Sequence, residues 1–86
     1  MNTFALTVAS PDGELFKGEA SKLSLRGIGG ELAILARHVP FVTAVLPGKI
    51  RIVLPDGCEK LFSIEGGLLT VSSASVTLLT NVMTDV

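Results

Sequence analysis

Turn-forming residues recur along this chain at intervals of roughly 8–12 residues, the spacing typical of short antiparallel strands. Turn-forming residues, mostly glycine, proline, aspartate and serine, stand at Ser10–Gly13, Gly18, Gly27–Gly30, His38–Pro40, Pro47–Gly48, Pro55–Gly57, Gly66–Gly67 and Ser72–Ser75. Between these turns, apolar and polar residues alternate with the period of a half-buried strand, as in Phe4–Val8 and Ile50–Leu54. No segment shows the apolar stripe of an amphipathic helix. The spacing therefore predicts an all-β fold, an antiparallel sandwich or barrel.

The expected strands follow from where the alternation starts and stops. They are Phe4–Val8, Glu14–Lys17, Lys22–Arg26, Leu32–Ala36, Phe41–Leu46, Lys49–Leu54, Glu59–Ile64, Leu68–Ser72 and Val76–Thr80. A chain of 86 residues provides one domain. Domains of this size bury only roughly 60–65% of their unfolded surface, so a modest core is expected.

Charge and composition argue against several classes of partner. The formal net charge is −1, and the lysines and arginines are scattered singly without forming a basic run. Tryptophan and tyrosine are absent, so no aromatic platform supports nucleic-acid binding. The amino terminus lacks a charged leader, and no apolar run approaches the ~20 residues that span a bilayer. We expect a soluble protein, with a single cysteine, Cys58, favouring a reducing compartment.

Candidate groups for chemistry are sparse. His38 is the only histidine, and no cluster of histidine, cysteine and acid has the spacing of metal ligands. Acids occur mostly in turns, and nothing selects a catalytic pair among them. Gly27–Gly30 is followed by an apolar β-type run rather than a helix, so it is not expected to cradle phosphate. The sequence predicts no catalytic residue, no cofactor and no metal.

Hydrophobic residues make up 48% of this small chain. Such a domain cannot hide all of them, and large exposed apolar patches mark surfaces that bind partners. One interpretation is therefore a face covered permanently by another protein. The alternative is a sandwich core that is simply rich in Val, Leu and Ala.

One ordered set of motifs resembles a known family. The set is centred on Gly30-Glu31-Leu32-Ala33-Ile34-Leu35, His38-Val39-Pro40, Thr43-Ala44 and Pro47-Gly48. Further matches are Phe4-Ala5-Leu6-Thr7-Val8 with Ser10-Pro11, Leu15-Phe16-Lys17-Gly18, Ile64-Glu65-Gly66-Gly67 and Val76-Thr77-Leu78-Leu79. Together they resemble the amino-terminal domain of the epsilon subunit of F-type ATP synthases, and they cover nearly the whole chain. Ala36 stands where the family commonly has proline.

The resemblance implies a flattened antiparallel β-sandwich of two roughly five-stranded sheets over residues 1–86. It also implies a non-catalytic rotor subunit in the central stalk, which couples the membrane c-ring to the gamma subunit during proton-driven ATP synthesis. Most of the family continues into a pair of carboxy-terminal helices. These helices are absent from this sequence, either because the natural subunit is short or because the chain is an excised domain. We expect a coupling subunit without them.

The resemblance also implies which residues contact the c-ring and the gamma subunit. The corner that faces the c-ring corresponds to Gly30, Glu31 and Leu32, with His38 nearby, and Ser10 and Lys49 correspond to contacts with the gamma subunit. Membrane association is expected only through the complex, on the cytoplasmic face of the plasma membrane or an equivalent energy-coupling membrane. No obligate homo-oligomer is expected. The alternative is a free-standing β-sandwich module that binds a peptide or a sugar.

Overall fold

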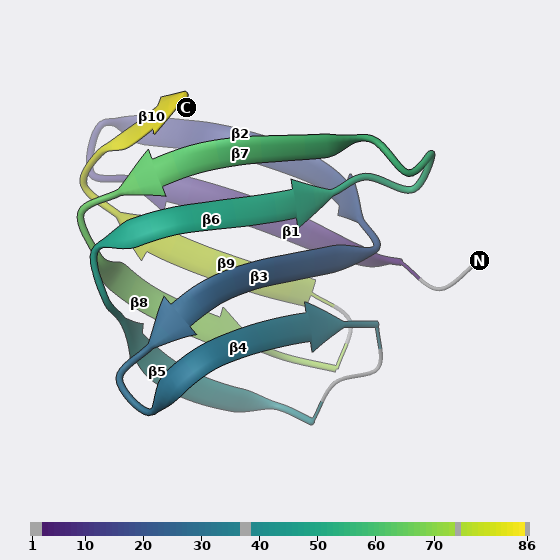
Figure 1. The fold of residues 1–86 in the computed structure, drawn as a ribbon, viewed down its shortest axis with the longest axis horizontal. Helices are drawn as coiled ribbons and strands as arrows, with labels where there is room; N and C mark the ends of the chain where they lie inside the picture. The colour runs from purple at the N-terminus through teal and green to yellow at the C-terminus, as the bar shows by residue number, and fades with distance from the viewer. Residues whose placement is uncertain (1–2, 37–38, 74, 86) are drawn as a thin grey trace.

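Ten β-strands make up the computed structural model, which describes residues 3–36, 39–73 and 75–85 (Figure 1). The strands are β1 (Phe4–Ser10), β2 (Gly13–Ala20), β3 (Lys22–Gly27), β4 (Gly30–Leu35), β5 (Phe41–Val45), β6 (Gly48–Val53), β7 (Glu59–Ile64), β8 (Gly67–Val71), β9 (Ser75–Thr80) and β10 (Met83–Asp85). None of the described residues lies in a helix, and accordingly these parts of the chain contain no helix able to cross a bilayer. The all-β prediction is confirmed.

The strands are stacked in two layers of five. One layer runs β10-β7-β6-β3 and ends with β4, which pairs with β3, and the other runs β5-β8-β9-β1-β2. Figure 1 shows the first layer in front of the second. We call them the front and back layers. A single bridge between Gly27 and Val45 joins β3 to β5, so the two predicted sheets are hydrogen-bonded into one that folds over on itself.

The core lies between the layers and is built by the inward half of each alternating strand. Eight of its side chains are essentially inaccessible to solvent: Leu6, Val8, Leu23, Ile34, Ile50, Ile52, Leu69 and Leu78. Burying one such side chain stabilises the fold by about 1.5–3 kcal/mol. Because successive side chains of a strand point to opposite faces, the same strands leave every second residue on the outside.

Glycines let the two layers approach closely at their junction. Val45 pairs with both Gly27 and Gly67, and Gly67 pairs in turn with Thr80 on β9. A Cβ added to Gly67 would lie 2.0 Å from the carbonyl oxygen of Leu79. The Thr80 hydroxyl is buried and donates a 2.6 Å hydrogen bond to the Gly66 carbonyl. Only glycine fits such a close approach of two backbones.

Two features of the fold differ from the sequence-based expectation. The short strand β10 follows Thr80 and pairs with β7, although three residues carry too little alternation to be recognised as a strand. The pairing of β1 with β9 is parallel, whereas every other pairing in the described sheet is antiparallel. Alternation shows which face of a strand is buried, but it carries no information on a partner some 70 positions away in the chain.

Candidate protein-interaction site

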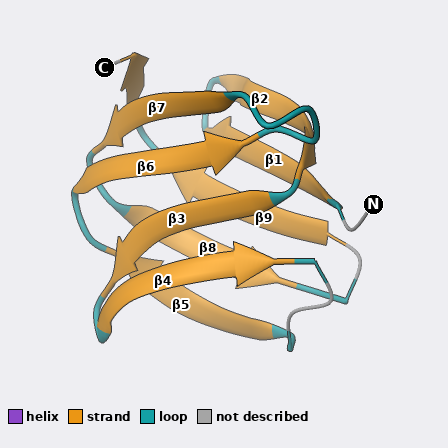
Figure 2. Cartoon of the chain, turned by 45° about the vertical axis from the view of Figure 1, so that its right-hand side comes forward, coloured by secondary structure: helices purple, strands orange, loops and turns teal. Residues whose placement is uncertain are grey.

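Five connections gather at one end of the sandwich, which we call the turn end. They are the β1–β2, β3–β4 and β5–β6 turns and the β7–β8 and β9–β10 connections, all on the left in Figure 1. In the rotated view of Figure 2 the β3–β4, β5–β6 and β7–β8 connections are again on the left. The register places them together, since Ser10 pairs with Gly13, Gly27 with Gly30, and Gly48 with Ile64 at this end. Loops held by a rigid sheet are common places for binding residues.

The predicted ring-facing corner lies at the β3–β4 turn. Gly30 has φ of +125°, a backbone conformation that favours glycine, and Glu31 follows it with an exposed side chain. In the register, Glu31 faces Arg26 across the hairpin. Leu32 is only half-exposed, because its side chain packs under Gly27 and against the core. The corner therefore presents Gly30 and Glu31 fully and Leu32 in part.

His38 lies outside the described residues, so its predicted place near Glu31 stays a prediction. The strands that flank this segment end at Leu35 and begin at Phe41. Both of these residues lie at the end of the sandwich opposite to the turn end. The strand Gly30–Leu35 therefore leads from the turn end to the opposite end of the sandwich, and the chain returns through Phe41–Val45. The described residues of this stretch do not form a single corner.

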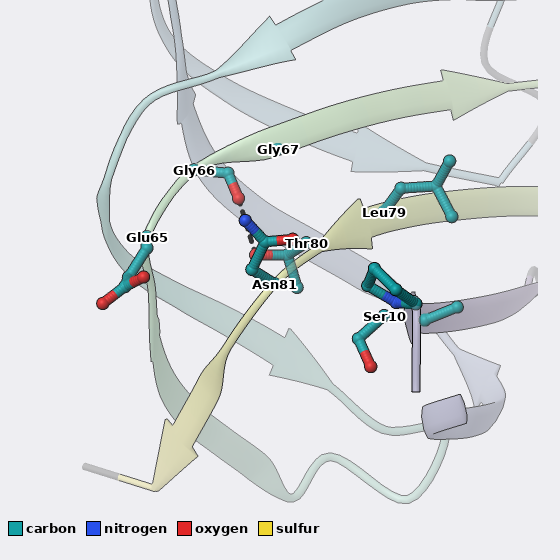
Figure 3. Close-up of a pocket in the computed structure, with 9 residues that line it drawn as sticks. Ser10, Glu65, Gly66, Gly67, Leu79, Thr80 and Asn81 are labelled. Carbon is teal, nitrogen blue, oxygen red and sulfur yellow. Dashed lines mark hydrogen bonds between the residues drawn. The ribbon is translucent and has the colours of Figure 1, made fainter. Parts of the chain in front are cut away.

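Ser10 lies at the turn end on the back layer, beside a pocket of about 440 Å³ (Figure 3). Its hydroxyl oxygen accepts a hydrogen bond from the Asp12 amide at 3.2 Å, as in a turn closed by a serine side chain. Its neighbours Ala9 and Pro11 also line the pocket. The rest of the lining comes from the β7–β8 connection and the start of β8, and from the end of β9 and the residue after it, among them Glu65, Leu79 and Asn81. The pocket is large enough to receive one side chain of a partner.

A row of apolar side chains crosses the outer face of the back layer next to this pocket. Ala44 on β5 pairs with Leu68, Leu68 with Leu79, and Leu79 with Ala9 on β1. Leu68 and Leu79 are 42% and 47% exposed. We call these four residues the apolar row. It was not predicted residue by residue, although the hydrophobic content pointed to such a surface and the alternation of each strand could have located it.

Lys49 lies on the opposite layer from Ser10. It is the second residue of β6, exposed on the front layer, and it lines a groove together with Glu31 and Leu32. The structure therefore gathers Ser10, Lys49 and Glu31 at one end of the molecule, but the two residues predicted to contact gamma face away from each other. An interface that includes both would have to extend across the turn end.

The groups that could support chemistry are dispersed among the described residues, where no three histidine, cysteine or acidic side chains cluster as a metal site would require. Cys58 lies in the β6–β7 turn and is exposed. Its side-chain hydrogen bond to Asp56, followed by the charge of that carboxylate, raises the pKa of the thiol. The Asp56 carboxylate also accepts a 2.9 Å hydrogen bond from the Cys58 amide, which lowers the pKa of the acid.

Asp56→Asn is expected to speed the reaction of Cys58 with a disulfide reagent severalfold near pH 8. Removing the carboxylate lowers the pKa of the thiol, so more of the reactive thiolate is present. The measurement is the rate of thiol release against pH, whose midpoint should move to lower pH in the variant. Asp12→Asn, in the other aspartate-glycine hairpin, is the control and should leave the rate unchanged; equal rates in all three proteins would contradict the assigned contact.

Comparisons with known proteins agree with one another. A family model described as the β-sandwich domain of the ATP synthase delta/epsilon chain matches residues 3–86. The ATP synthase epsilon chain of Delftia acidovorans is 41% identical over 81 residues, which cover 94% of this chain and 59% of that protein. The chain thus spans well under two thirds of this relative.

Two solved structures share the fold. One is a chain of the Euglena gracilis mitochondrial ATP synthase, in a structure of its OSCP, F1 and c-ring, with a TM-score of 0.92, 22% identity, and coverage of 99% of this chain and 54% of that one. The other is a chain of the central stalk and c-ring of Tetrahymena thermophila mitochondrial ATP synthase, with a TM-score of 0.80, 16% identity, and coverage of 95% and 66%.

Proposed function

Because this chain belongs to the family of ATP synthase delta/epsilon-chain β-sandwich domains, we propose that it is a non-catalytic rotor subunit of an F-type ATP synthase. In this role it couples a membrane c-ring to a gamma subunit during proton-driven ATP synthesis. The ten strands share one core, which supports residues 1–86 as a single folding unit. A close-packed sandwich suits such a coupling part, because protein interiors deform little under load.

The observation that carries this proposal is the presence of two distinct outward surfaces on one rigid body. The turn end presents the exposed carboxylate of Glu31 beside Gly30, while the back layer presents the apolar row next to Ser10. A part that transmits torque has to hold two partners at once. The two surfaces lie on different sides of the sandwich, so both can be occupied together.

The turn end is proposed as the ring-facing surface, through Gly30, Glu31 and Leu32. His38 is kept as a ring contact on the motif alone, because the flanking residues Leu35 and Phe41 lie at the opposite end of the sandwich. The family resemblance implies that the loops of the c-ring are polar and carry a basic residue. An exposed carboxylate such as Glu31 would form a charge-assisted hydrogen bond with that residue. The subunit would then lie at the cytoplasmic face of the plasma membrane, or of an equivalent energy-coupling membrane, and reach that membrane only through the complex.

The apolar row is proposed as the main surface for gamma. Covering Leu68 and Leu79 removes apolar area from water, and each fully covered side chain contributes on the order of 1 kcal/mol or more to association. Ser10 and the pocket beside it lie at the edge of this surface. Lys49 remains a proposed gamma contact, which requires gamma to extend across the turn end to the front layer.

The decisive experiment is co-purification of the 86-residue chain with a gamma subunit and a c-ring, with Glu31→Lys as the test variant. We expect the variant to lose about tenfold in ring attachment, because the substitution replaces attraction to a basic ring loop by repulsion. Binding to gamma should be unchanged, because the back layer is untouched.

Glu19→Lys is the matched control, since Glu19 lies on β2, away from the turn end, and accepts a hydrogen bond from Thr3. It should behave as the unmodified chain. Failure to bind gamma under any condition would refute the rotor assignment and leave a free-standing module for a peptide or sugar as the working hypothesis. Ring binding that is equally strong in Glu31→Lys would refute only the role of Glu31.

A further inference from the structure

Basic residues that stand singly in the sequence come together in a groove on the outer face of the front layer. The groove has a volume of about 800 Å³ and lies between β3 and β6, with β4 forming one wall. Four of the seven lysines and arginines of the chain line it: Lys22, Arg26, Lys49 and Arg51. Among the described residues of its lining, Glu31 is the single acid.

The groove exists because β3 and β6 separate. Their register ends where Ser24 pairs with Arg51. Beyond that point the two strands no longer pair with each other, although β3 stays paired with β4 and β6 with β7 along their whole lengths. The β5–β6 turn occupies the end of the gap, where the Leu46 amide donates a 2.9 Å hydrogen bond to the Arg26 carbonyl. The buried side chains of Leu25 and Ile50 lie beneath, so the groove has an apolar floor and a cationic rim.

The charge of the groove is opposite in sign to that of the whole chain. Arg51 is 3.3 Å from Glu59, an exposed ion pair that solvent screens. Lys22, Arg26 and Lys49 form no ion pair with any residue that the structure describes. Concentrated cations above an apolar floor focus a positive potential that attracts an anionic partner.

The spacing of the cations selects the shape of that partner. Lys22 and Arg26 stand four residues apart on one strand, a distance of roughly 13 Å, and Lys49 and Arg51 stand two apart, roughly 6.6 Å. A single phosphate can be shared by neighbouring cations such as Lys49 and Arg51, because lysine and arginine side chains are long enough to converge. It is too small to pair with cations that are spread over roughly 13 Å of a strand. An extended peptide repeats its same-side residues every ~6.6 Å, which matches the cations along both strands.

We propose that this groove binds an extended acidic segment of a partner protein, with alternate carboxylates paired to Arg26, Lys49 and Arg51 and the residues between them facing solvent. The contact goes beyond the rotor role, and it shares Lys49 with the proposed gamma contact and Glu31 with the proposed ring-facing surface. Glu31 stays at the mouth of the groove beside Arg26, where it remains exposed.

The test uses a blocked seven-residue peptide of alternating glutamate and serine, titrated into the isotopically labelled 86-residue chain at low salt. We expect saturable shifts of amide resonances in β3 and β6, and loss of binding as salt rises, because exposed charge pairs are screened. Charge reversal by Arg26→Glu with Lys49→Glu should weaken the dissociation constant at least about tenfold. Arg26→Gln with Lys49→Gln, which neutralises the same positions without adding acids beside Glu31, should weaken it in the same direction.

Lys17→Glu with Lys60→Glu is the matched control, since it changes the net charge equally at residues outside the groove. This control should bind the peptide within about twofold of the unmodified chain, as expected for distant rim charges. Equal weakening in the control and the groove variant, or no shifts in β3 and β6, would overturn the proposal. Inorganic phosphate that competes for the same resonances as tightly as the peptide would also overturn it, in favour of a small-anion site. The rotor proposal is tested separately, by co-purification with gamma and the c-ring. The groove proposal can therefore fail while the rotor proposal holds, and the reverse is also true.

Discussion

Replacing Gly67 by alanine is expected to destabilise the sandwich by about 3 kcal/mol, at the upper end of the usual cost of overpacking. Gly67 begins β8 and lies between Val45 and Thr80 at the junction of the layers. A Cβ at this position would lie 2.0 Å from the carbonyl oxygen and 3.0 Å from the carbonyl carbon of Leu79. Both atoms are backbone, so no side chain can rotate away. To make room for the Cβ, β8 and β9 have to move apart at the junction of the two layers, which closes the core.

The measurement is urea-induced unfolding followed by circular dichroism, with the free energy of unfolding extrapolated to zero denaturant. Gly29→Ala is the control, since a Cβ at Gly29 would meet nothing within 4 Å. Its free energy of unfolding should stay within about 0.5 kcal/mol of that of the parent chain, as for most surface substitutions. If Gly67→Ala is as mild as the control, β8 and β9 are not in close contact there and the described junction is wrong.

Truncation of Leu78 to alanine is expected to lower the free energy of unfolding by about 3 kcal/mol, within the range for buried leucines. Leu78 is completely buried at the centre of β9, paired with Val8 on β1 and with Leu69 on β8. Removing its methyl groups leaves a cavity between two layers that cannot close fully, because both are held by strand pairing. A small domain has little stability to spare, so a marked fall in the unfolding midpoint should be easy to measure.

Leu79→Ala, at the next residue of β9, provides the control. Leu79 is 47% exposed in the apolar row, and Leu79→Ala should cost less than about 1 kcal/mol in the isolated chain. A strand that slips by one residue exchanges its two faces. Reversed costs, with Leu79→Ala the more damaging, would show that β9 has the opposite register. Leu79→Ala should weaken binding to gamma more than Leu78→Ala does, since of these two residues only Leu79 lies on the proposed gamma surface.

The fold class and most strand positions could be predicted from local sequence. Turn chemistry at Ser10–Gly13 and Pro55–Gly57 marked two hairpins, and both turns are present in the structure. Alternation along Phe4–Val8 identified the buried face, because the side-chain period of two leaves each residue only two possible directions. The same local signal could not reveal the β1–β9 pairing or the three-residue strand β10.

For the candidate site, too, some features could be predicted from the sequence and others could not. Gly30, Glu31, Ser10 and Lys49 were singled out by resemblance, and their common position at the turn end is a property of the fold that their separate places in the sequence do not show. The apolar row crosses β5, β8, β9 and β1, so it exists only once these strands are paired. His38 remains a prediction from the motif.

The amino-acid sequence is enough to predict that this chain forms turns and half-buried strands, because both signals are read within a few residues. It also determined the family, through an ordered set of motifs. Which strands are neighbours, and where β3 and β6 separate, became known from the folded structure. The basic groove shows the difference most directly. Lys22 and Arg26 are isolated from Lys49 and Arg51 along the chain, and they line one groove because long-range strand pairing, which depends on the whole core, brings them together.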